Sequence, residues 1–529
     1  MTRRALLAIV LLAAVLHSIG IARTLLPAQD GLKFLRVARQ FHHQPWTDVV
    51  RGTDQHPLYP ALIALAEPVV RAVLGRGPAT WRIAAQLVSA GASVALLFPL
   101  FGLIRALFDE RIACVGTLAY VLLPFPAAVG HDTLSDSLAL LAFLVALRVG
   151  EVALRRDGWF PAVGCGLAAG VGYLARPEVL VVPAAVLLTA ATRWRMPAEA
   201  RQRLVPRLAA LTVVFLATVG SYTLVKGEVS EKLALRIGAA LGKRPAITRK
   251  TPQWLPRGLN DPRWDFSPKE EAEDAPQTKP LRIVGRLAQQ WGEGLGWIFA
   301  FFALWGVARD RFIRRFIRRD EDPEANVGRR LIAMYLALFS AVLVRHAWKM
   351  GYLSGRHTLT LVVVSVPWAA AGTTICACRL ASVLRWGPRL ARGVGVATLL
   401  AAVAASALFQ LKPSHPTRWG HWAAGRWLAA HARPADAVLD TRGWAAFVSG
   451  RSSYDYWHVR QAFTDDHLAY IVVGTDELEA ESRRGATLRA VLAYAAEPVA
   501  AFPEIRGGEG TGVQVFYYRR PASWEGLRP

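Results

Sequence analysis

The chain has 529 residues, of which 53% are hydrophobic, and its formal net charge is +24. Apolar runs of about 20 residues, long enough to cross the hydrocarbon core of a bilayer, recur along it and exclude a purely soluble protein. The basic residues are concentrated in short loops between these runs, which argues against a surface that binds nucleic acid.

Eleven membrane-spanning helices are predicted, and residues 1–411 are expected to form one α-helical polytopic membrane domain. The predicted spans are 5–22, 84–104, 112–130, 137–153, 160–175, 177–192, 208–225, 291–308, 331–348, 358–378 and 394–411. The first span also resembles a signal peptide, with Arg3 and Arg4 before an apolar run. No clear cleavage site follows it, so a retained span is favoured.

The distribution of arginine predicts the orientation. If the N-terminus is cytoplasmic and each span changes sides, the segments 1–4, 105–111, 154–159, 193–207, 309–330 and 379–392 lie inside. They hold 23 Lys and Arg residues against 9 Asp and Glu residues, as the positive-inside bias requires. We therefore expect a multi-pass protein of the cytoplasmic (inner) membrane, surrounded by membrane lipids.

Two loops on the predicted outer side are long. In loop 23–83, apolar residues recur at helical spacing, which is typical of helices that lie in the membrane interface. Loop 226–290 is rich in proline and charge and is expected to be mobile. On the inner side, the basic amphipathic segment 310–324 is expected to lie on anionic headgroups.

The C-terminal segment 412–529 is expected to form a small extracytoplasmic α/β domain. It is nearly neutral, with 14 basic and 13 acidic residues. The stretches "AVLD", "AYIVVG" and "GVQVFYY" are typical of strands, and 419–432 and 476–495 of helices. The four cysteines all lie in predicted spans, so no disulfide framework is implied.

Polar and charged residues gather in five loops at the predicted outer ends of the helices. The candidate site residues among them are Asp30, His56, Asp132, Asp136, Arg176, Glu178, Lys349, Tyr352, Arg356 and His357. Several also have a purely structural interpretation. Asp30 and Asp136 suit helix N-termini, the stretch "HPLYP" suits a turn, and "ARPE" (175–178) matches the dipoles of two adjoining helices.

The loop 345–357 is harder to explain structurally. It carries three cations and two histidines on the side of the membrane where cations are disfavoured, with no acid nearby. An anionic ligand is the better explanation, and phosphate fits best because arginine offers it a planar pair of donors.

Five short motifs occur in the same order as in the GT-C membrane glycosyltransferases, and the chain resembles this family. Within it, the chain is most similar to the protein O-mannosyltransferases and the lipid A aminoarabinose transferases. The motifs are "QDGLKFLRVA", "HPLYP", "LSDSLALLAFLVAL", "GLAAGVGYLARPE" and "YLSGRH". The family usually has tyrosine where this chain has Phe34.

The resemblance implies transfer of a sugar from a polyprenyl-phosphate carrier to a hydroxyl acceptor, with inversion. Asp30 is then the expected base, and Arg356, Lys349 and Arg176 the expected contacts of the phosphate. His56 with Asp132 or Asp136 would orient the sugar or the acceptor, and Glu178, Tyr352 and His357 would line the same site. Some relatives bind a divalent metal, but the sequence shows no ligand set for one, so no cofactor is expected.

The sequence leaves two other classes of function open. A lipid or glycan transporter, or flippase, would also place charge at helix ends, although usually near mid-span and with internal repeats. A non-catalytic envelope scaffold would use the C-terminal segment as a binding module. The acceptor, whether lipid, glycan or protein, is not named by the sequence.

Overall fold

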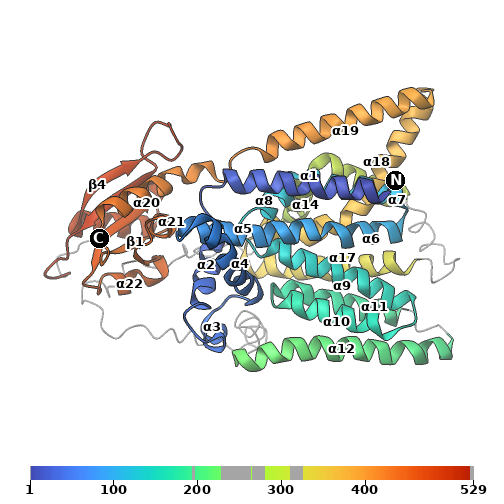
Figure 1. Cartoon of the computed structure of the whole chain (residues 1–529), viewed down its shortest axis with the longest axis horizontal. Coiled ribbons are helices and arrows are strands. Elements are labelled where there is room, and N and C mark those ends of the chain that lie inside the picture. Colours follow the sequence, from blue (N-terminus) through green and yellow to red (C-terminus); the bar gives the residue numbers. More distant parts are fainter. Residues whose placement is uncertain (1, 193–196, 228–263, 265–279, 310–325, 525–529) are drawn as a thin grey trace.

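A computed structural model describes residues 2–192, 197–227, 264, 280–309 and 326–524. A bundle of long helices forms one part of the molecule, and a small sheet with its own helices forms the other (Figure 1). The bundle comprises α1 (Thr2–Arg23), α5 (Pro78–Ala95), α6 (Leu97–Leu107), α7 (Glu110–Leu122), α8 (Pro124–Gly130), α9 (Asp136–Arg155), α10 (Trp159–Tyr173), η1 (Pro177–Leu180), α11 (Val181–Ala191), α12 (Ala198–Lys226), α14 (Pro280–Leu295), α15 (Trp297–Arg309), α17 (Val327–Met350), η3 (Gly355–Thr358), α18 (Leu359–Val383) and α19 (Pro388–Gln410).

Each of the eleven predicted spans falls on helix. Within the described residues, 7 helices are long and apolar enough to cross a membrane, or up to 9 if each of two bent pairs counts as one span. The other two predicted spans correspond to α10, with 15 residues, and to the short apolar stretch Pro177–Ala191. This is an integral membrane protein.

The two bent pairs have local causes. Helices α7 and α8 meet at 68°, where Pro124 lacks an amide hydrogen and Leu123 is extended (φ −69°, ψ 120°). Helices α14 and α15 meet at 105°. The bend lies at Gly296, whose φ of +66° is a left-handed conformation that glycine adopts more readily than other residues.

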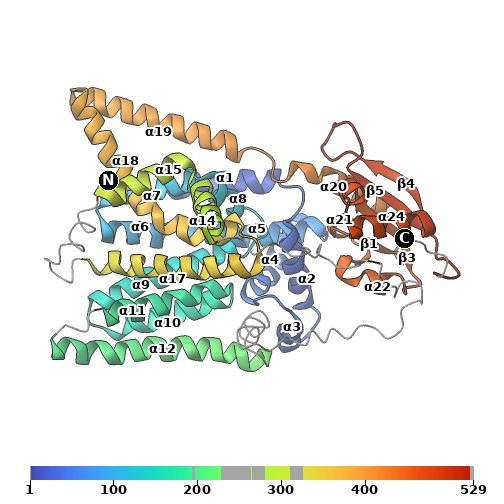
Figure 2. The same cartoon turned by 180° about the vertical axis from the view of Figure 1, so that it is seen from behind.

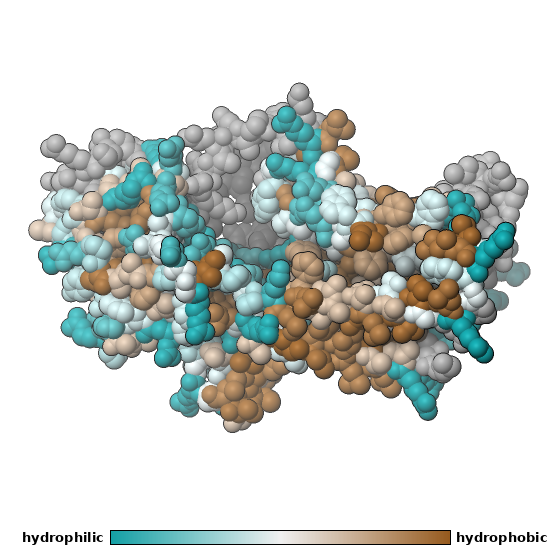
Figure 3. Space-filling view, turned by 90° about the horizontal axis from the view of Figure 1, so that it is seen from above, coloured by the Kyte–Doolittle hydropathy of each residue, from teal (hydrophilic) through white to brown (hydrophobic). Residues whose placement is uncertain are grey.

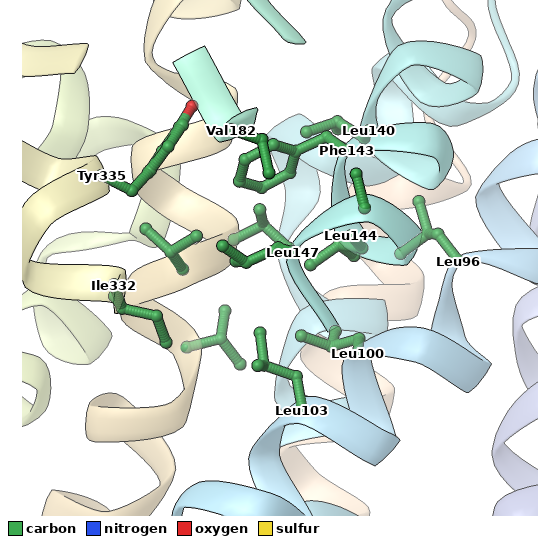
Figure 4. Close-up of a cluster of buried hydrophobic side chains, with 14 of the residues drawn as sticks. Leu96, Leu100, Leu103, Leu140, Phe143, Leu144, Leu147, Val182, Ile332 and Tyr335 are labelled. Atoms are coloured by element: carbon green, nitrogen blue, oxygen red, sulfur yellow. The ribbon is translucent and has the colours of Figure 1, made fainter. Parts of the chain in front are cut away.

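The core of the bundle is a continuous cluster of leucine and aromatic side chains. Figure 4 shows Leu140, Phe143, Leu144 and Leu147 of α9, with Phe143 and Leu147 towards Tyr335 of α17 and Leu144 towards Leu96. Their spacing puts them on one side of α9, and the rings of Phe143 and Tyr335 are 4.8 Å apart. Apolar side chains also cover much of the bundle surface, between more polar ends (Figure 3).

The first long loop is largely helical, as expected. It holds α2 (Gln29–Gln40), α3 (Trp46–Gly52) and α4 (Leu58–Leu74), which lie across the end of the bundle next to the sheet (Figures 1 and 2). Helix α4 exposes Leu65, Val69 and Val73 on one side, as an interfacial helix would. Phe34 of α2 packs edge-on against Tyr59 of α4 at 5.1 Å.

The prediction for loop 226–290 agrees with the structure at its start and is wrong at its C-terminal end. Helix α12 continues to Lys226, α14 already begins at Pro280, and Trp264 is buried in the core of the C-terminal part. The rest of this loop, and the segment 310–324, lie outside the described residues.

The C-terminal part is built on a five-stranded mixed sheet with strand order β2-β1-β3-β5-β4. Its elements are η4 (Pro416–Arg418), α20 (Trp419–His431), β1 (Ala437–Asp440), α21 (Trp444–Ser449), β2 (Ser452–Tyr454), η5 (Tyr456–His458), α22 (Val459–Ala462), β3 (Leu468–Gly474), α23 (Thr475–Glu479), α24 (Arg483–Ala495), β4 (Ala496–Phe502) and β5 (Val513–Tyr518). The three predicted strands are confirmed, and the helix predicted at 476–495 is divided into α23 and α24. Strands β2 and β4 were not predicted. Their residues are exposed or half-buried, so neither strand has the alternation of buried and exposed side chains that marks a strand in a sequence.

Candidate active site

Four segments that are far apart in sequence meet in one ion-pair cluster at the end of the bundle nearest the sheet. Arg356 Nη1 lies 2.7 Å from Asp30 Oδ2, and Arg356 Nη2 lies 2.8 Å from Asp136 Oδ2. Arg176 pairs with the other oxygen of Asp136. Arg176 Nε also lies 3.5 Å from Glu178 Oε2. Asp30, Arg356, Asp136, Arg176 and Glu178 therefore form one chain of alternating charge, here called the charged cluster.

The members of the charged cluster differ in exposure. The side chain of Asp136 is only 2% exposed and is held by both arginines, whereas that of Asp30 is 49% exposed. Arg356 lies between them and donates hydrogen bonds from Nη1 to Asp30 and from Nε and Nη2 to Asp136. Asp136 therefore fixes the arginines, and Asp30 is the carboxylate that a ligand can reach.

Local structure explains why these side chains converge. Gly31 packs so closely on Thr133 that a Cβ at this position would overlap the threonine hydroxyl, which holds α2 against the start of α9. Arg176 precedes Pro177, where α10 has ended and η1 begins. Arg356 lies in η3, whose first turn has a capping box between Ser354 and His357.

Asp30 does not serve as a helix cap. The N-cap position of α2 is Ala28, and no side chain caps this helix. Asp30 lies in the first helical turn, where the helix dipole favours a negative charge, but its hydrogen bond goes to Arg356. The structural interpretation of Asp30 therefore loses its main support.

The electrostatic surroundings keep Asp30 ionised. Burial raises the pKa of its carboxyl, but the hydrogen bond and charge of Arg356, together with Lys33 and Arg176, outweigh burial and hold this pKa below the usual value of 3.8. An ionised carboxylate at neutral pH can accept a proton. Its basicity is low while Arg356 is bound to it.

A small cavity of about 30 Å³ lies among Asp136, Arg176, Glu178, Arg356 and His357. The ring of His357 is 4.9 Å from that of His346 and 6.0 Å from that of Tyr352, which is itself half-exposed. Tyr352 and His357 thus flank the charged cluster.

Lys349 and His56 lie elsewhere. Lys349 is exposed near the end of α17 and takes no part in the ion pairs of the charged cluster. His56 is buried, and its ring contacts those of Tyr173 at 5.3 Å and Tyr222 at 5.9 Å. In the described part of the chain, neither of these two predicted residues is paired with Arg356.

Asp132 joins parts of the chain instead of facing the charged cluster. Its Oδ1 accepts hydrogen bonds from the backbone N–H groups of Ala28 and Thr133, at 3.1 Å and 2.7 Å. Its Oδ2 lies 2.8 Å from Nε2 of His415, in the segment between α19 and the sheet. These contacts hold the start of α2 and the C-terminal part in place.

We expect Asp132→Ala to lower the free energy of unfolding by about 1–3 kcal/mol, because the buried N–H of Thr133 loses its acceptor and His415 loses its partner, while the N–H of Ala28 keeps only Thr133 Oγ1. Thermal unfolding of the purified variant measures this. If melting were unchanged while binding of a ligand at the charged cluster were lost, Asp132 would be a ligand contact and this assignment would be wrong.

Two contacts of the site were not predicted from sequence. Lys33 Nζ lies 3.8 Å from Asp30 Oδ1, one turn along α2. This i, i+3 spacing was visible in "QDGLKF". His415 is recognisable only from the structure, because nothing in its sequence context links it to Asp132.

Comparison with known proteins gives one sequence match and several structural ones. Residues 55–222 match the family model described as dolichyl-phosphate-mannose-protein mannosyltransferase. No curated protein sequence matches the chain. ArnT from Cupriavidus metallidurans has a similar structure in the apo state, with a TM-score of 0.58, 15% identity and coverage of 99% of both chains. For the same protein bound to undecaprenyl phosphate, the TM-score is 0.57 and the identity 14%, again with coverage of 99% of both chains.

The Archaeoglobus fulgidus oligosaccharyltransferase AglB, in complex with an inhibitory peptide and a dolichol-phosphate, is also similar. The TM-score is 0.54 at 13% identity, over 98% of this chain and 74% of that one. Both neighbours are GT-C proteins, and the likeness extends over almost the whole chain. The chain has a GT-C fold.

Within this GT-C fold, the family match is partial. It includes His56, Asp132, Asp136, Arg176 and Glu178, but ends at Tyr222 and does not reach Asp30 or Arg356. These two residues are joined to the matched region by the charged cluster itself.

The described part of the GT-C fold contains no group of three or more His, Cys, Asp or Glu side chains that could hold a metal ion. The acids of the charged cluster are each paired with arginine and do not converge on a common point. A reaction without a metal cofactor stays a prediction.

Proposed function

We propose that the protein transfers a sugar from a polyprenyl-phosphate carrier to a hydroxyl acceptor outside the cytoplasm, with inversion at the anomeric carbon. The observation that carries this proposal is the pairing of the half-exposed Asp30 with Arg356, whose other side is fixed by the buried Asp136. In this proposal Asp30 is the base and Arg356 the phosphate-binding cation, and their contact lets one ligand meet both. ArnT with undecaprenyl phosphate and AglB with a dolichol-phosphate support this choice of donor.

The proposed step needs only these two functions. The acceptor oxygen attacks the anomeric carbon, while the bond from this carbon to the phosphate oxygen breaks and leaves its electron pair on the phosphate. Asp30 takes the proton of the acceptor hydroxyl, so the products are a glycoside and polyprenyl phosphate. Because phosphate departs as a stable anion, no general acid is required.

Arg356 stabilises the charge that grows on the departing phosphate. We propose that the phosphate draws Arg356 away from Asp30, so that the sugar enters between them. Loss of the arginine contact raises the pKa of Asp30 towards its usual value and makes it a better base at the moment it is needed. Asp136, Arg176 and Glu178 would keep Arg356 in position as positioning residues.

The proposed orientation places the N-terminus in the cytoplasm of an inner-membrane protein and residues 412–529 outside. In support, the N-terminus and the sheet lie at opposite ends of the bundle (Figures 1 and 2). We expect a phosphatase fused after Pro529 to be active and a cytoplasmic reporter at the same place to be inactive. The reverse result would put the charged cluster on the cytoplasmic side and contradict the proposal.

The enzyme is tested by incubating the purified full chain with a panel of labelled polyprenyl-phosphate sugars. Wild type should release polyprenyl phosphate from at least one donor, and Asp30→Asn should not. A transporter or a scaffold would leave every donor intact, and its transport or binding would not depend on the Asp30 carboxylate.

A further inference from the structure

A second, larger cavity lies beside the charged cluster. Its volume is about 370 Å³, and it lies between α2 and the loops that follow β1, β2 and β3. Lys33 and Arg36 line it from α2, Arg442 from the loop after β1, and Asp476 and Glu477 from the start of α23. This space, here called the α2–sheet cavity, takes no part in the proposed donor chemistry.

The α2–sheet cavity occupies the position in the sheet where ligands usually bind. Strands β1, β2 and β3 are parallel, so their carboxyl ends lie at one edge. After β1 the chain turns to β2 on one side, and after β3 it goes to β4 on the other. Such a change of direction leaves a crevice between the carboxyl ends of β1 and β3, and α/β sheets bind ligands in such crevices.

The charges around the cavity are already paired with one another. Arg442 Nη2 lies 2.7 Å from Asp476 Oδ2, and Arg36 Nη2 lies 3.1 Å from Asp455 Oδ2. Arg484 Nη2 lies 2.7 Å from Glu477 Oε1. The lining therefore has little net charge to attract an ion, but it presents donors and acceptors side by side. Sugar hydroxyls match this pattern, because each one both donates and accepts a hydrogen bond.

The cavity also lies next to the proposed base. Gln29 and Lys33, which flank Asp30 on α2, line it, and Lys33 Nζ is 3.8 Å from Asp30 Oδ1. A molecule bound here has its edge close to the exposed carboxylate. Resting on the proposed transfer reaction, we propose that the α2–sheet cavity binds an uncharged sugar unit of the acceptor, and that the hydroxyl which Asp30 deprotonates belongs to a carbohydrate.

The test uses the full chain in lipid nanodiscs, with a donor that the wild type consumes. Three kinds of soluble acceptor are compared: neutral oligosaccharides, serine- and threonine-containing peptides, and water. We expect transfer to at least one oligosaccharide and none to the peptides. In Arg442→Ala and in Asp476→Asn, the ratio of transfer to oligosaccharide over release to water should fall about 10-fold or more, because charge-assisted hydrogen bonds to the acceptor are lost.

Asp476→Asn is a mild change, since this side chain is 73% exposed. The matched control is Arg433→Ala, which removes an arginine of the same sheet domain, 80% exposed and paired only locally with Asp436 in the described structure. It should leave the ratio unchanged. Saturation-transfer NMR with the same oligosaccharides and no donor gives an independent readout, in which the wild type but not Arg442→Ala should show contact.

The outcomes separate the two proposals. If the wild type consumes no donor, the proposed function fails and the inference fails with it. If the wild type consumes donor but transfers the sugar to peptides instead of oligosaccharides, or if both cavity variants keep the wild-type ratio, the transferase stands and the sugar-binding role of the α2–sheet cavity is wrong.

Discussion

Asp30→Asn should lower the rate of sugar transfer by about 10²–10⁴-fold, the usual contribution of a general base. Asparagine keeps the shape of the side chain but cannot take the acceptor proton. Binding of polyprenyl phosphate should not weaken, because the contact between Asp30 and Arg356 opens when the phosphate binds and the base acts mainly in the transition state. Single-turnover transfer and lipid binding are measured on the same preparation.

Asp30→Ala separates this role from a structural one. If Asp30 mattered only for the helix start, asparagine would be nearly silent and alanine would cost about 1 kcal/mol of stability. We expect both variants to be equally inactive and to melt close to the wild type. An asparagine variant with near-normal transfer would show that the carboxylate is structural, and the base would have to be sought at Asp136, since the contacts of Asp132 hold the fold together.

Arg356→Ala should weaken binding of polyprenyl phosphate by about 10- to 150-fold, which corresponds to a charge-assisted contact of about 1.5–3 kcal/mol. Arg356→Lys should recover only part of this, because lysine lacks the planar pair of donors that contacts Asp30 and Asp136 together. Asp136 keeps its pairing with Arg176 in both variants, so folding should be largely preserved. Unchanged lipid affinity in the alanine variant would remove Arg356 from the phosphate site.

The same variant has a predicted pH signature. In the free wild-type protein, Arg356 holds the pKa of Asp30 below 3.8, so the acid limb of the pH profile of kcat/KM should have its midpoint below that value. Without Arg356, the pKa of Asp30 rises, and loss of activity on acidification should begin at higher pH. An acid limb at the same pH in wild type and Arg356→Ala would show that Asp30 is not the titrating group.

Much of the bundle could be predicted because each span carries its own signal. A run of about 20 apolar residues and arginines at one end are local features, and all eleven predicted spans lie on helix. The bends at Pro124 and Gly296 each divide one predicted span into two shorter helices, and the apolar pattern of the sequence shows them less clearly. Trp264 shows the limit of composition, because this side chain belongs to a charged, proline-rich stretch of sequence and is nevertheless buried in a distant core.

The charged cluster was predictable in part. Alternation of the spans puts Asp30, Asp136, Arg176 and Arg356 at one end of the bundle, but only packing decides which of them touch. Asp30 and Arg356 are 326 positions apart. Asp132 and Asp136 are four positions apart, yet one binds backbone and His415 while the other binds two arginines. The α2–sheet cavity depends on how α2 and the loops after the strands meet, and no local pattern in the sequence encodes that.

The most direct test of the proposed site is a structure of the full chain in nanodiscs with polyprenyl phosphate. We expect the phosphate within hydrogen-bond distance of the Arg356 guanidinium, with Asp136 still bound to this arginine and the contact between Arg356 and Asp30 opened. A phosphate bound elsewhere, with the Asp30–Arg356 pair intact at 2.7 Å, would contradict the proposed mechanism.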